Sequence, residues 1–377
     1  MHKLRYICRL YAKINTGIDK LNDIFLEIKK VFTVQQEYTI EELLELKKKG
    51  KRILVDVRSP KEYHEASIPG AINIPVFTDE ERAEVGTLYK QVSPEAAKKR
   101  GLEIFADKLP RFIETFQKLE KPPTVFCWRG GMRSKTAVTV LELMGIKAGR
   151  LQGGIRSYRQ WLVKEMENYH LDPDLLVLNG YTGTGKTWLL QQLKNDGFPT
   201  LDLEQMAGHR GSIFGQIGLK PNNQKKFDSL LLEELEHYKN KHYIIIEGES
   251  KRIGRVMLPD FFYKKKETGK QFFIHLPIPE RVKIIMSDYN PEEDPQQFID
   301  AYQFIRKNIH TPIANQIQQL LKNNEFPEAV ALLLEYYYDS RYDHAITQAE
   351  GEVCHIHAET AEEALTKLKQ ELANVMF

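Results

Sequence analysis

One cysteine, Cys127, lies in a stretch whose residue types favour nucleophilic chemistry on an anion. The stretch Phe126–Ser134 reads FCWRGGMRS and joins the apolar run Thr124–Phe126 to a segment with helical character, Lys135–Met144. A helix N-terminus presents backbone N–H groups and a positive dipole, so it attracts anions and stabilises a thiolate. We therefore predict that Cys127 is a nucleophile at the start of a helix.

The neighbours of Cys127 suit a loop that also binds the anion. Two adjacent glycines let the backbone curl so that successive N–H groups converge, and Arg133 supplies a planar, permanently charged group for oxyanions. A lone cysteine is usually a small buried core residue, but a core residue needs no glycine pair and no arginines close by. The predicted catalytic residues are Cys127 and Arg133, and the predicted anion loop is Trp128, Arg129, Gly130, Gly131 and Met132.

A second glycine-rich turn has the spacing of a loop that binds a diphosphate. Residues 180–187 read GYTGTGKT, which fits G-x-x-x-x-G-K-[ST], and they follow the apolar run Leu175–Leu178. In such loops N–H groups surround the phosphates, the lysine neutralises them, and the last hydroxyl can reach Mg²⁺. The predicted diphosphate-binding residues are Gly180, Thr182, Gly183, Thr184, Gly185, Lys186 and Thr187.

Two carboxylates, Glu247 and Glu249, follow a further apolar run, Tyr243–Ile246. An aspartate is expected at such a position for ordinary ATP hydrolysis, and this chain has none there. The glutamates could hold a metal ion or simply cap the end of a strand, and both interpretations stay open.

Two more loops carry glycines and basic residues that could face a substrate or an RNA backbone: residues 208–215 (GHRGSIFG) and 250–254 (SKRIG). Basic residues outnumber acidic ones from Gln205 to Lys270, which favours phosphate contacts, although most charged segments simply face solvent. The candidate substrate or RNA contacts are His209, Arg210, Ser212, Glu249, Lys251, Arg252 and Arg255.

The segment Cys354-His355-Ile356-His357 has the residue types of a zinc site. In a strand, however, alternation places both histidines on the face opposite the cysteine, and no second pair of ligands is visible. We therefore predict no metal site and no tightly bound cofactor.

The composition is that of a folded protein with more than one domain. At about 150 residues per domain, 377 residues suggest two or three domains. The formal net charge is only +2, so any surface for nucleic acid must be local. Three cysteines argue against a disulfide framework and for a reducing compartment. No apolar run could span a membrane, and we expect a cytoplasmic location.

Strands, glycine-rich turns and helices alternate, which predicts two α/β units with parallel sheets. In the first, a helix capped by Thr39 and Glu42 precedes a strand at Arg52–Val57. In the second, the strand runs named above are joined by Phe272–Leu276, a largely helical region at Pro291–Tyr338, the strand Val353–His357 and a last helix capped by Thr360 and Glu363.

The predicted division is an N-terminal extension at residues 1–36, one domain at 37–167 and a second at 168–377. The extension is basic, with apolar residues at roughly helical spacing, so it could be an amphipathic helix that touches RNA or a membrane. The plainer interpretation is an extension with little role, and we expect its deletion to leave activity within a few-fold.

Several motifs of the first unit resemble the rhodanese domain. Residues 56–59 (DVRS), 62–63 (EY) and 68–75 (IPGAINIP) resemble its first half, and Cys127 falls where that family carries its persulfide-forming cysteine. The spacing from Cys127 to Arg133 is longer than in the usual rhodanese loop and is similar to phosphatase-like relatives, whose loop accommodates a phosphate group. The resemblance implies a substrate bearing both a chalcogen and a phosphate.

From about residue 37 to its end, the chain resembles the bacterial tRNA 2-selenouridine synthase family. The motifs that carry this resemblance are Asp79–Gln91, CWRGGMRS, GYTGTGKT, GHRGS with FG after it, ESKRIG and Tyr337-Tyr338-Asp339. The implied fold is a rhodanese-like parallel-sheet domain followed by a P-loop NTPase-like α/β domain with a helical C-terminal part.

The resemblance also implies a transferase that acts on tRNA. It replaces sulfur by selenium in 2-thiouridine at the wobble position, with selenophosphate as the selenium donor. An S-geranyl-2-thiouridine intermediate is made from geranyl diphosphate. Because a thiocarbonyl sulfur leaves poorly, its alkylation to a thioether makes chemical sense. We place the diphosphate on the loop of Lys186 and the selenium chemistry at Cys127.

Two alternatives belong to other functional classes. One is a rhodanese-type sulfurtransferase or phosphatase that uses the Cys127 loop, regulated by a nucleotide switch at the second loop. The other is a nucleotide-dependent RNA-binding module without chemistry. The sequence leaves open the oligomeric state, the tRNAs selected and the need for Mg²⁺.

Overall fold

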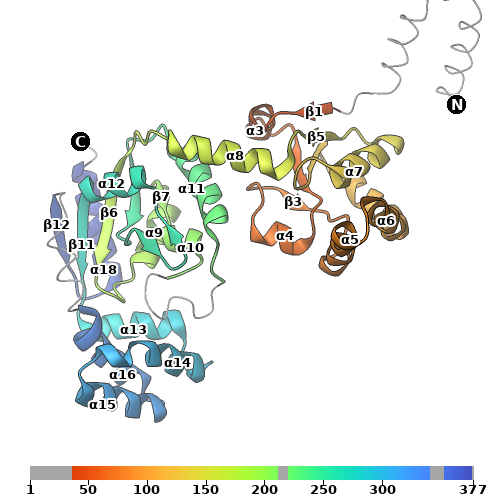
Figure 1. Cartoon of the computed structure of the whole chain (residues 1–377). Helices are drawn as coiled ribbons and strands as arrows, with labels where there is room; N and C mark the ends of the chain where they lie inside the picture. Colours follow the sequence, from red (N-terminus) through yellow and green to blue (C-terminus); the bar gives the residue numbers. More distant parts are fainter. Residues whose placement is uncertain (1–35, 211–219, 340–351, 376–377) are drawn as a thin grey trace, which may run out of the picture. The chain divides into compact units, whose positions relative to one another are not determined.

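The computed structural model describes residues 36–210, 220–339 and 352–375, so all but the last residue of the predicted extension (1–36) and the candidate Ser212 lie outside the described residues. The chain forms two compact units, Met1–Trp161 and Leu162–Phe377, and the division between them falls within helix α8 (Gly154–Glu167). Both units are α/β with parallel sheets (Figure 1), which confirms the predicted fold class.

The first unit is built on a parallel sheet with the strand order β1-β5-β4-β2-β3. Its strands are β1 (Gln36–Tyr38), β2 (Ile53–Asp56), β3 (Ile72–Asn73), β4 (Pro123–Phe126) and β5 (Gly149–Leu151). The strands predicted within Arg52–Val57 and Thr124–Phe126 are therefore confirmed as β2 and β4. The edge strand β1 is too short to show a hydrophobic pattern, and the sequence did not predict it.

Helices cover both faces of this sheet. Helix α3 (Ile40–Lys48) begins as predicted, because Thr39 Oγ1 accepts the Glu42 N–H while the Glu42 carboxylate accepts the Thr39 N–H at 2.9 Å. Helices α6 (Pro94–Gln117) and α7 (Met132–Leu143) form one core with Val55 and Val125 of the sheet. Leu54 and Phe126, the neighbouring residues in the same strands, point to the opposite face and are also buried. The short helix α4 (Pro60–Glu65) follows β2.

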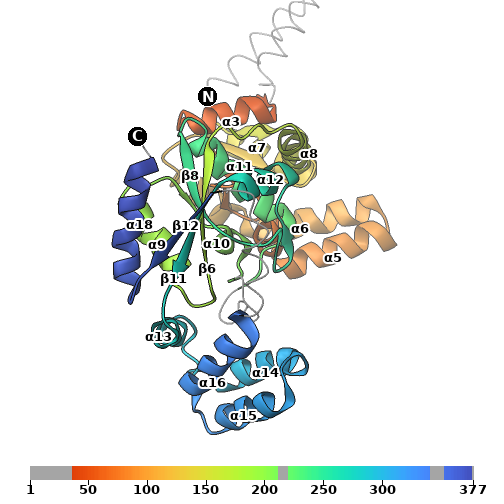
Figure 2. The ribbon, with the colours of Figure 1, turned by 90° about the vertical axis from the view of Figure 1, so that its left-hand side faces the viewer.

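A helical hairpin between β3 and β4 was not predicted from the sequence. Helix α5 (Asp79–Gln91) starts with a capping box formed by Thr78 and Glu81, and α6 starts with Ser93 as N-cap and Pro94 at its first position. The two helices lie side by side (Figure 2). These caps were local signals for the hairpin.

The second unit has a parallel sheet with the order β12-β11-β6-β8-β7. The strands are β6 (Asp174–Gly180), β7 (Thr200–Leu201), β8 (Tyr243–Glu247), β11 (Lys270–His275) and β12 (Val353–His357). A small antiparallel pair, β9 (Arg252–Ile253) and β10 (Val256–Met257), follows β8. Every strand predicted in this unit is present.

Side chains of β6 alternate between two cores. Leu176 and Leu178 pack with helices α9 (Lys186–Asn195) and α18 (Ala361–Val375), and the Thr360 cap of α18 is confirmed by its 3.2 Å hydrogen bond from the Glu363 N–H. Leu175 and Val177 pack on the other face with α10 (Leu203–Ala207), α11 (Gln224–Tyr238) and α12 (Asp260–Thr268). The long apolar run of β6 is thus buried on both sides.

The predicted helical region is a bundle between β11 and β12 with its own core around Phe298, Tyr302 and Ile317 (Figure 2). It comprises α13 (Ile278–Tyr289), α14 (Pro295–Ile305), η3 (Arg306–Asn308), α15 (Thr311–Lys322), α16 (Phe326–Leu333) and η4 (Leu334–Tyr338). Within the described ranges, no helix combines the length and apolar character needed to cross a membrane.

Candidate functional site

Cys127 directly follows β4 and begins the loop that leads into α7. Helix α7 starts at Met132, earlier than the predicted Lys135, because Gly131 is its N-cap; Arg133 therefore lies in the first helical turn. The Cys127 side chain is 3 % exposed, and its Sγ lies 3.3 Å from the Ser134 hydroxyl. The structure thus places a buried thiol at the base of a loop that ends in a helix N-terminus.

The loop keeps its shape through glycines and backbone hydrogen bonds. Gly130 has φ of +64°, a left-handed conformation that glycine adopts without strain. A Cβ on Gly154 would lie 2.2 Å from the Cys127 carbonyl oxygen, so only glycine allows the chain to approach so closely. The Ile155 N–H donates to the Cys127 carbonyl at 2.8 Å, and the Arg156 N–H donates to that of Trp128 at 3.1 Å.

Arg133, the predicted anion clamp, is bound to a carboxylate that the sequence analysis did not select. Its Nη1 lies 2.6 Å from Oε2 of Glu62, and Arg82 Nε lies 3.7 Å from the same oxygen. Burial alone would raise the pKa of Glu62, but the hydrogen bond and the charge of Arg133 hold this pKa below its ordinary value. The role of Arg133 toward a substrate anion stays a prediction.

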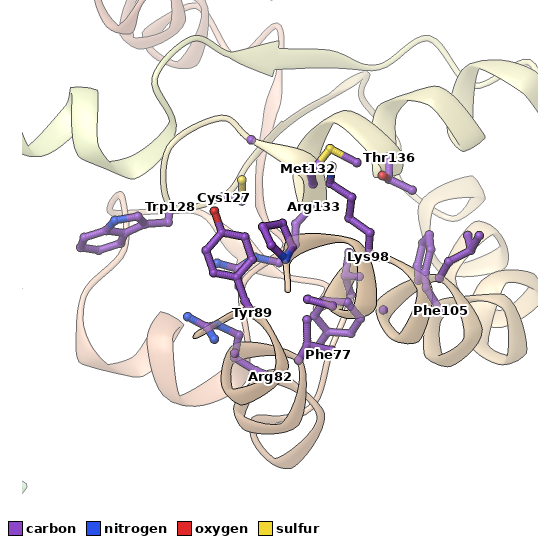
Figure 3. Close-up of a pocket in the computed structure, with 18 of the residues that line it drawn as sticks. Phe77, Arg82, Tyr89, Lys98, Phe105, Cys127, Trp128, Met132, Arg133 and Thr136 are labelled. Atoms are coloured by element: carbon purple, nitrogen blue, oxygen red, sulfur yellow. The ribbon is translucent and has the colours of Figure 1, made fainter. Parts of the chain in front are cut away.

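A cavity of about 670 Å³ opens beside Cys127 (Figure 3). Its walls come from the α5–α6 hairpin, the Cys127 loop and the start of α7. Of the predicted loop residues, Gly130 alone does not line it; the others are Cys127, Trp128, Arg129, Gly131, Met132 and Arg133. The structure therefore brings the predicted residues to one place, together with a hairpin that the sequence did not reveal.

The predicted diphosphate loop joins β6 to α9, as its motif requires. Gly183 and Gly185 have φ of +82° and +71°, and a Cβ on Gly183 would lie 2.9 Å from the Arg281 carbonyl oxygen. Lys186 Nζ donates to the Gly180 carbonyl at 3.0 Å, and the buried Thr184 hydroxyl donates to the Tyr181 carbonyl at 2.9 Å. The loop is thus folded around the lysine side chain.

Arg281 of α13 supports this loop and was missed from the sequence. It is 2 % exposed, donates from Nε to the Thr182 carbonyl at 2.9 Å, and binds Asp339 through two hydrogen bonds of 2.8 and 2.6 Å. Asp339 belongs to the quoted motif Tyr337-Tyr338-Asp339, but nothing in the sequence pairs it with Arg281. This ion pair joins the loop to the helical bundle.

Carboxylates gather beside Thr187. The Thr187 hydroxyl donates a hydrogen bond to Glu204 at 2.9 Å. Burial and the negative charge of Glu204 raise the pKa of Glu249 to about 7, although the positive charge of Lys186 opposes this shift. Glu247 is fully buried, and burial and the nearby Asp202 raise its pKa as well. Glu204 and Asp202 were not selected from the sequence, because they follow the short strand β7.

Glu247 is the last residue of β8, and one of its two carboxylate oxygens binds the backbone of helix α10. Its Oε2 accepts the Leu203 N–H at 2.9 Å, so the residue caps the start of α10, whereas Oε1 has no hydrogen-bond partner among the described residues. Mg²⁺ bound with phosphates often uses only one or two protein ligands and keeps its waters. Thr187, with Glu204 beside it, fits such an ion bound jointly with a diphosphate.

Among the residues that the structure describes, no three His, Cys, Asp or Glu side chains are arranged to hold a metal ion by themselves. In β12, Ile356 is buried and Cys354 half-buried, while His355 and His357 are exposed on the opposite face. The predicted alternation of Cys354–His357 is therefore observed.

His209 and Gly254, described residues of the two candidate contact loops, lie against each other. A Cβ on Gly254 would lie 2.6 Å from the His209 ring, so Gly254 leaves room for this ring. His209 is buried, and burial lowers its pKa. The Arg210 guanidinium lies 4.9 Å from the centre of the Tyr289 ring. Glu249, in contrast, lies with the diphosphate loop rather than with these contacts.

The basic candidates differ in their exposure. Arg252 and Arg255 are exposed, whereas Lys251 is bound to Asp260 at 2.6 Å. Contact with tRNA through these side chains stays a prediction, and Arg252 and Arg255 are the better placed of the three.

Known protein families match both units. Residues 39–160 match the rhodanese-like domain, and residues 173–304 match the family described as "tRNA 2-selenouridine synthase AAA domain". Fold and site together define a protein that joins a rhodanese-like domain with a buried loop cysteine to a P-loop domain.

Curated relatives named tRNA 2-selenouridine synthase resemble the chain over most of its length. The protein of Hydrogenovibrio crunogenus is 32 % identical over 334 residues, which cover 80 % of this chain and 91 % of the relative. That of Bdellovibrio bacteriovorus is 37 % identical over 246 residues, 63 % of this chain and 64 % of the relative. The chain belongs to the tRNA 2-selenouridine synthase family.

The matches to the Bdellovibrio protein and to that of Nitrosomonas eutropha span 64 % and 62 % of those relatives' lengths. A solved N-terminal domain of a Clostridium difficile protein described as ATP/GTP-binding is 35 % identical; it covers 34 % of this chain and 99 % of its own, with a TM-score of 0.32.

Proposed function

We propose that this protein replaces sulfur by selenium in wobble-position 2-thiouridine of tRNA, in two steps at two sites. The observation that supports the proposal is that one chain of this family holds a buried thiol at the start of a loop that ends in a helix N-terminus, and a second, glycine-rich loop folded around Lys186. The names of the relatives support the overall activity. The substrates and the division of labour are our assignment.

In the first step the loop of residues 180–187 binds the diphosphate of geranyl diphosphate. The sulfur of 2-thiouridine attacks the first carbon of the geranyl group, the carbon–oxygen bond breaks, and the N3 proton is released with the diphosphate. Lys186 and the loop N–H groups neutralise the charge that develops on the leaving diphosphate. A Mg²⁺ ion held by Thr187 would supply further positive charge there.

In the second step the Cys127 loop binds the phosphate oxygens of selenophosphate. The Cys127 thiolate attacks phosphorus, a sulfur–phosphorus bond forms, and the phosphorus–selenium bond breaks to release hydrogen selenide. Selenium then adds to C2 of the S-geranylated ring, and geranyl thiol leaves. Water hydrolyses the sulfur–phosphorus bond to phosphate, so no oxidant is needed. The Ser134 hydroxyl, 3.3 Å from Sγ, suits stabilisation of the thiolate.

Mass spectrometry of tRNA nucleosides from cells with and without the chain tests the proposed function. We expect 2-selenouridine only in cells that contain the protein, and geranylated nucleoside when selenium is withheld. If the protein were a sulfurtransferase, a phosphatase or an RNA-binding module without chemistry, the levels of 2-selenouridine and of the geranylated nucleoside would be the same in the two kinds of cell. Equal levels would refute the proposal.

A further inference from the structure

The cavity beside Cys127 has more apolar surface than a small inorganic anion requires. Phe77, Val85 and Phe105 form part of its lining, and a Cβ on Gly101 would lie 3.2 Å from the Phe77 ring, so this glycine leaves room for the ring. Its volume of about 670 Å³ falls in the range of about 300–1,000 Å³ that is typical of sites for organic ligands. Selenophosphate or thiosulfate would occupy only a small part of it.

Large apolar side chains are also exposed at this cavity. Tyr89 and Leu102, from α5 and α6, are 61 % and 65 % exposed, and Trp128 and Met132, from the Cys127 loop and the start of α7, are 42 % and 59 % exposed. Exposed apolar groups gathered around one cavity indicate a ligand with apolar surface. Figure 3 shows Tyr89 and Phe77 with Cys127 around the same space.

The charged residues that line this cavity are all basic. They are Arg82, Lys90, Lys98, Arg129 and Arg133, and no aspartate or glutamate is among the lining residues. An apolar cavity with basic residues around it suits a ligand that combines an apolar chain with a polyanionic part. A prenylated nucleotide within an RNA chain has both features.

We propose that this cavity binds the geranyl chain of the S-geranylated nucleotide and so directs its C2 carbon to Cys127. The assignment rests on the proposed function, because the geranylated nucleotide is its intermediate. The apolar lining holds the chain. Because Arg82 and Arg133 are bound to Glu62, the exposed side chains of Lys90, Lys98 and Arg129 contact the flanking phosphates. Recognition of the chain lets the selenium step select alkylated 2-thiouridine over the unalkylated form.

The test compares two anticodon stem-loops that differ only in the geranyl group on 2-thiouridine. The full-length protein should bind the geranylated stem-loop at least tenfold more tightly, since each buried methylene adds about fourfold. The variant Tyr89→Gln/Leu102→Gln replaces two exposed apolar contacts with neutral polar groups of high helix propensity. It should lose most of this preference and keep its affinity for the 2-thiouridine stem-loop.

The matched control is Leu143→Gln/Met144→Gln, which changes two exposed apolar residues at the end of α7 that do not line the cavity. This variant should keep the full preference for the geranylated stem-loop. Equal preference in the two double variants, or no preference in the unmodified protein, would overturn the assignment.

Geranyl diphosphate is a second source of the same chain. If the cavity variant weakened binding of geranyl diphosphate but not of the geranylated stem-loop, the cavity would serve the first step and our assignment would be wrong. A third result would separate the two proposals. If the unmodified protein preferred the geranylated stem-loop, the cavity variant lost this preference, and the unmodified protein still installed no selenium, the proposed function would fail while the cavity assignment would stand.

Discussion

Protonation of Glu249, near Lys186, makes the free energy of unfolding depend on pH. Burial and Glu204 raise its pKa to about 7 from an ordinary value of 4.5. Between pH 4.5 and about 7 the folded protein therefore keeps a proton on Glu249 that the unfolded chain has released. The contribution of this group to the stability of the fold is complete below pH 4.5 and is lost as pH rises through 7. We expect Glu249→Gln to be more stable than the parent above pH 7, by up to about 1.4 kcal/mol for each unit of the shift.

Urea unfolding at pH 5 and pH 8, without divalent cations, measures this effect. The control is Glu328→Gln, which changes an exposed carboxylate of α16. The Glu249→Gln variant should flatten the pH dependence, and the control should reproduce that of the parent. A variant that follows the parent at both pH values would show that Glu249 is not held protonated.

At the scale of single residues, the sequence predicted what lies in contiguous motifs. Cys127 and Lys186 are each flanked by their glycines and helix starts, so the local chain was enough to select them. Glu62, Arg281 and Glu204 act on these loops from other elements, and their partners lie far along the chain. Only the tertiary fold shows such pairs, because either charged partner alone looks like an ordinary surface residue.

At the scale of elements, the segment that follows β5 fixes the shape of the Cys127 loop. Gly154 has φ of +62°, and an added Cβ would meet the Cys127 carbonyl oxygen at 2.2 Å and the Gly130 nitrogen at 2.5 Å. Because both neighbours are backbone atoms, Gly154→Ala must displace the loop. We expect it to lower the free energy of unfolding by about 2 kcal/mol or more and to abolish the selenium step while geranylation continues.

Gly145→Ala provides the matched control for this prediction. Gly145 also has a positive φ, +81°, but a Cβ there meets nothing within 4 Å. This control should show only the strain of the left-handed conformation, about 1–2 kcal/mol, and should keep selenium incorporation. Equal losses of stability and activity in the two variants would show that the close approach of Gly154 to the Cys127 carbonyl does not determine the shape of the loop.

The start of α7 and the α5–α6 hairpin depend on features other than the apolar pattern. The sequence predicted α7 from Lys135 because the apolar helix pattern begins there, whereas Gly131 starts the helix at Met132. The α5–α6 hairpin was read only as a family motif, although its N-terminal caps were visible. The cavity was beyond prediction, since its lining depends on how this hairpin packs beside the Cys127 loop.

At the scale of the whole molecule, tRNA affinity should depend on local basic surfaces, since the net charge is only +2. Replacing Lys251, Arg252 and Arg255 with alanine should weaken tRNA binding and reduce the slope of log affinity against log salt by about 2. Titrations at several salt concentrations measure both effects.

The control replaces Lys283, Lys307 and Lys322 of the helical bundle. One lysine of this set is ion-paired, to Glu280, as Lys251 is to Asp260. The control should keep most of the salt slope. An unchanged slope in the first variant would exclude the surface of Lys251, Arg252 and Arg255 from tRNA binding.

We propose that the two half-reactions take place at two different loops, those of Cys127 and Lys186. Each unit has its own core, so a substitution in one loop should leave the other unit folded. The decisive measurement is nucleoside mass spectrometry of 2-thiouridine tRNA treated with geranyl diphosphate and selenophosphate by the Cys127→Ala and Lys186→Ala proteins.

We predict that Cys127→Ala accumulates the geranylated nucleoside and makes no 2-selenouridine. Lys186→Ala should geranylate at least about a hundredfold more slowly, yet convert tRNA that was geranylated beforehand. A Cys127→Ala protein that stays folded and bound to tRNA but also fails to geranylate would show a single shared active site and refute the two-site proposal.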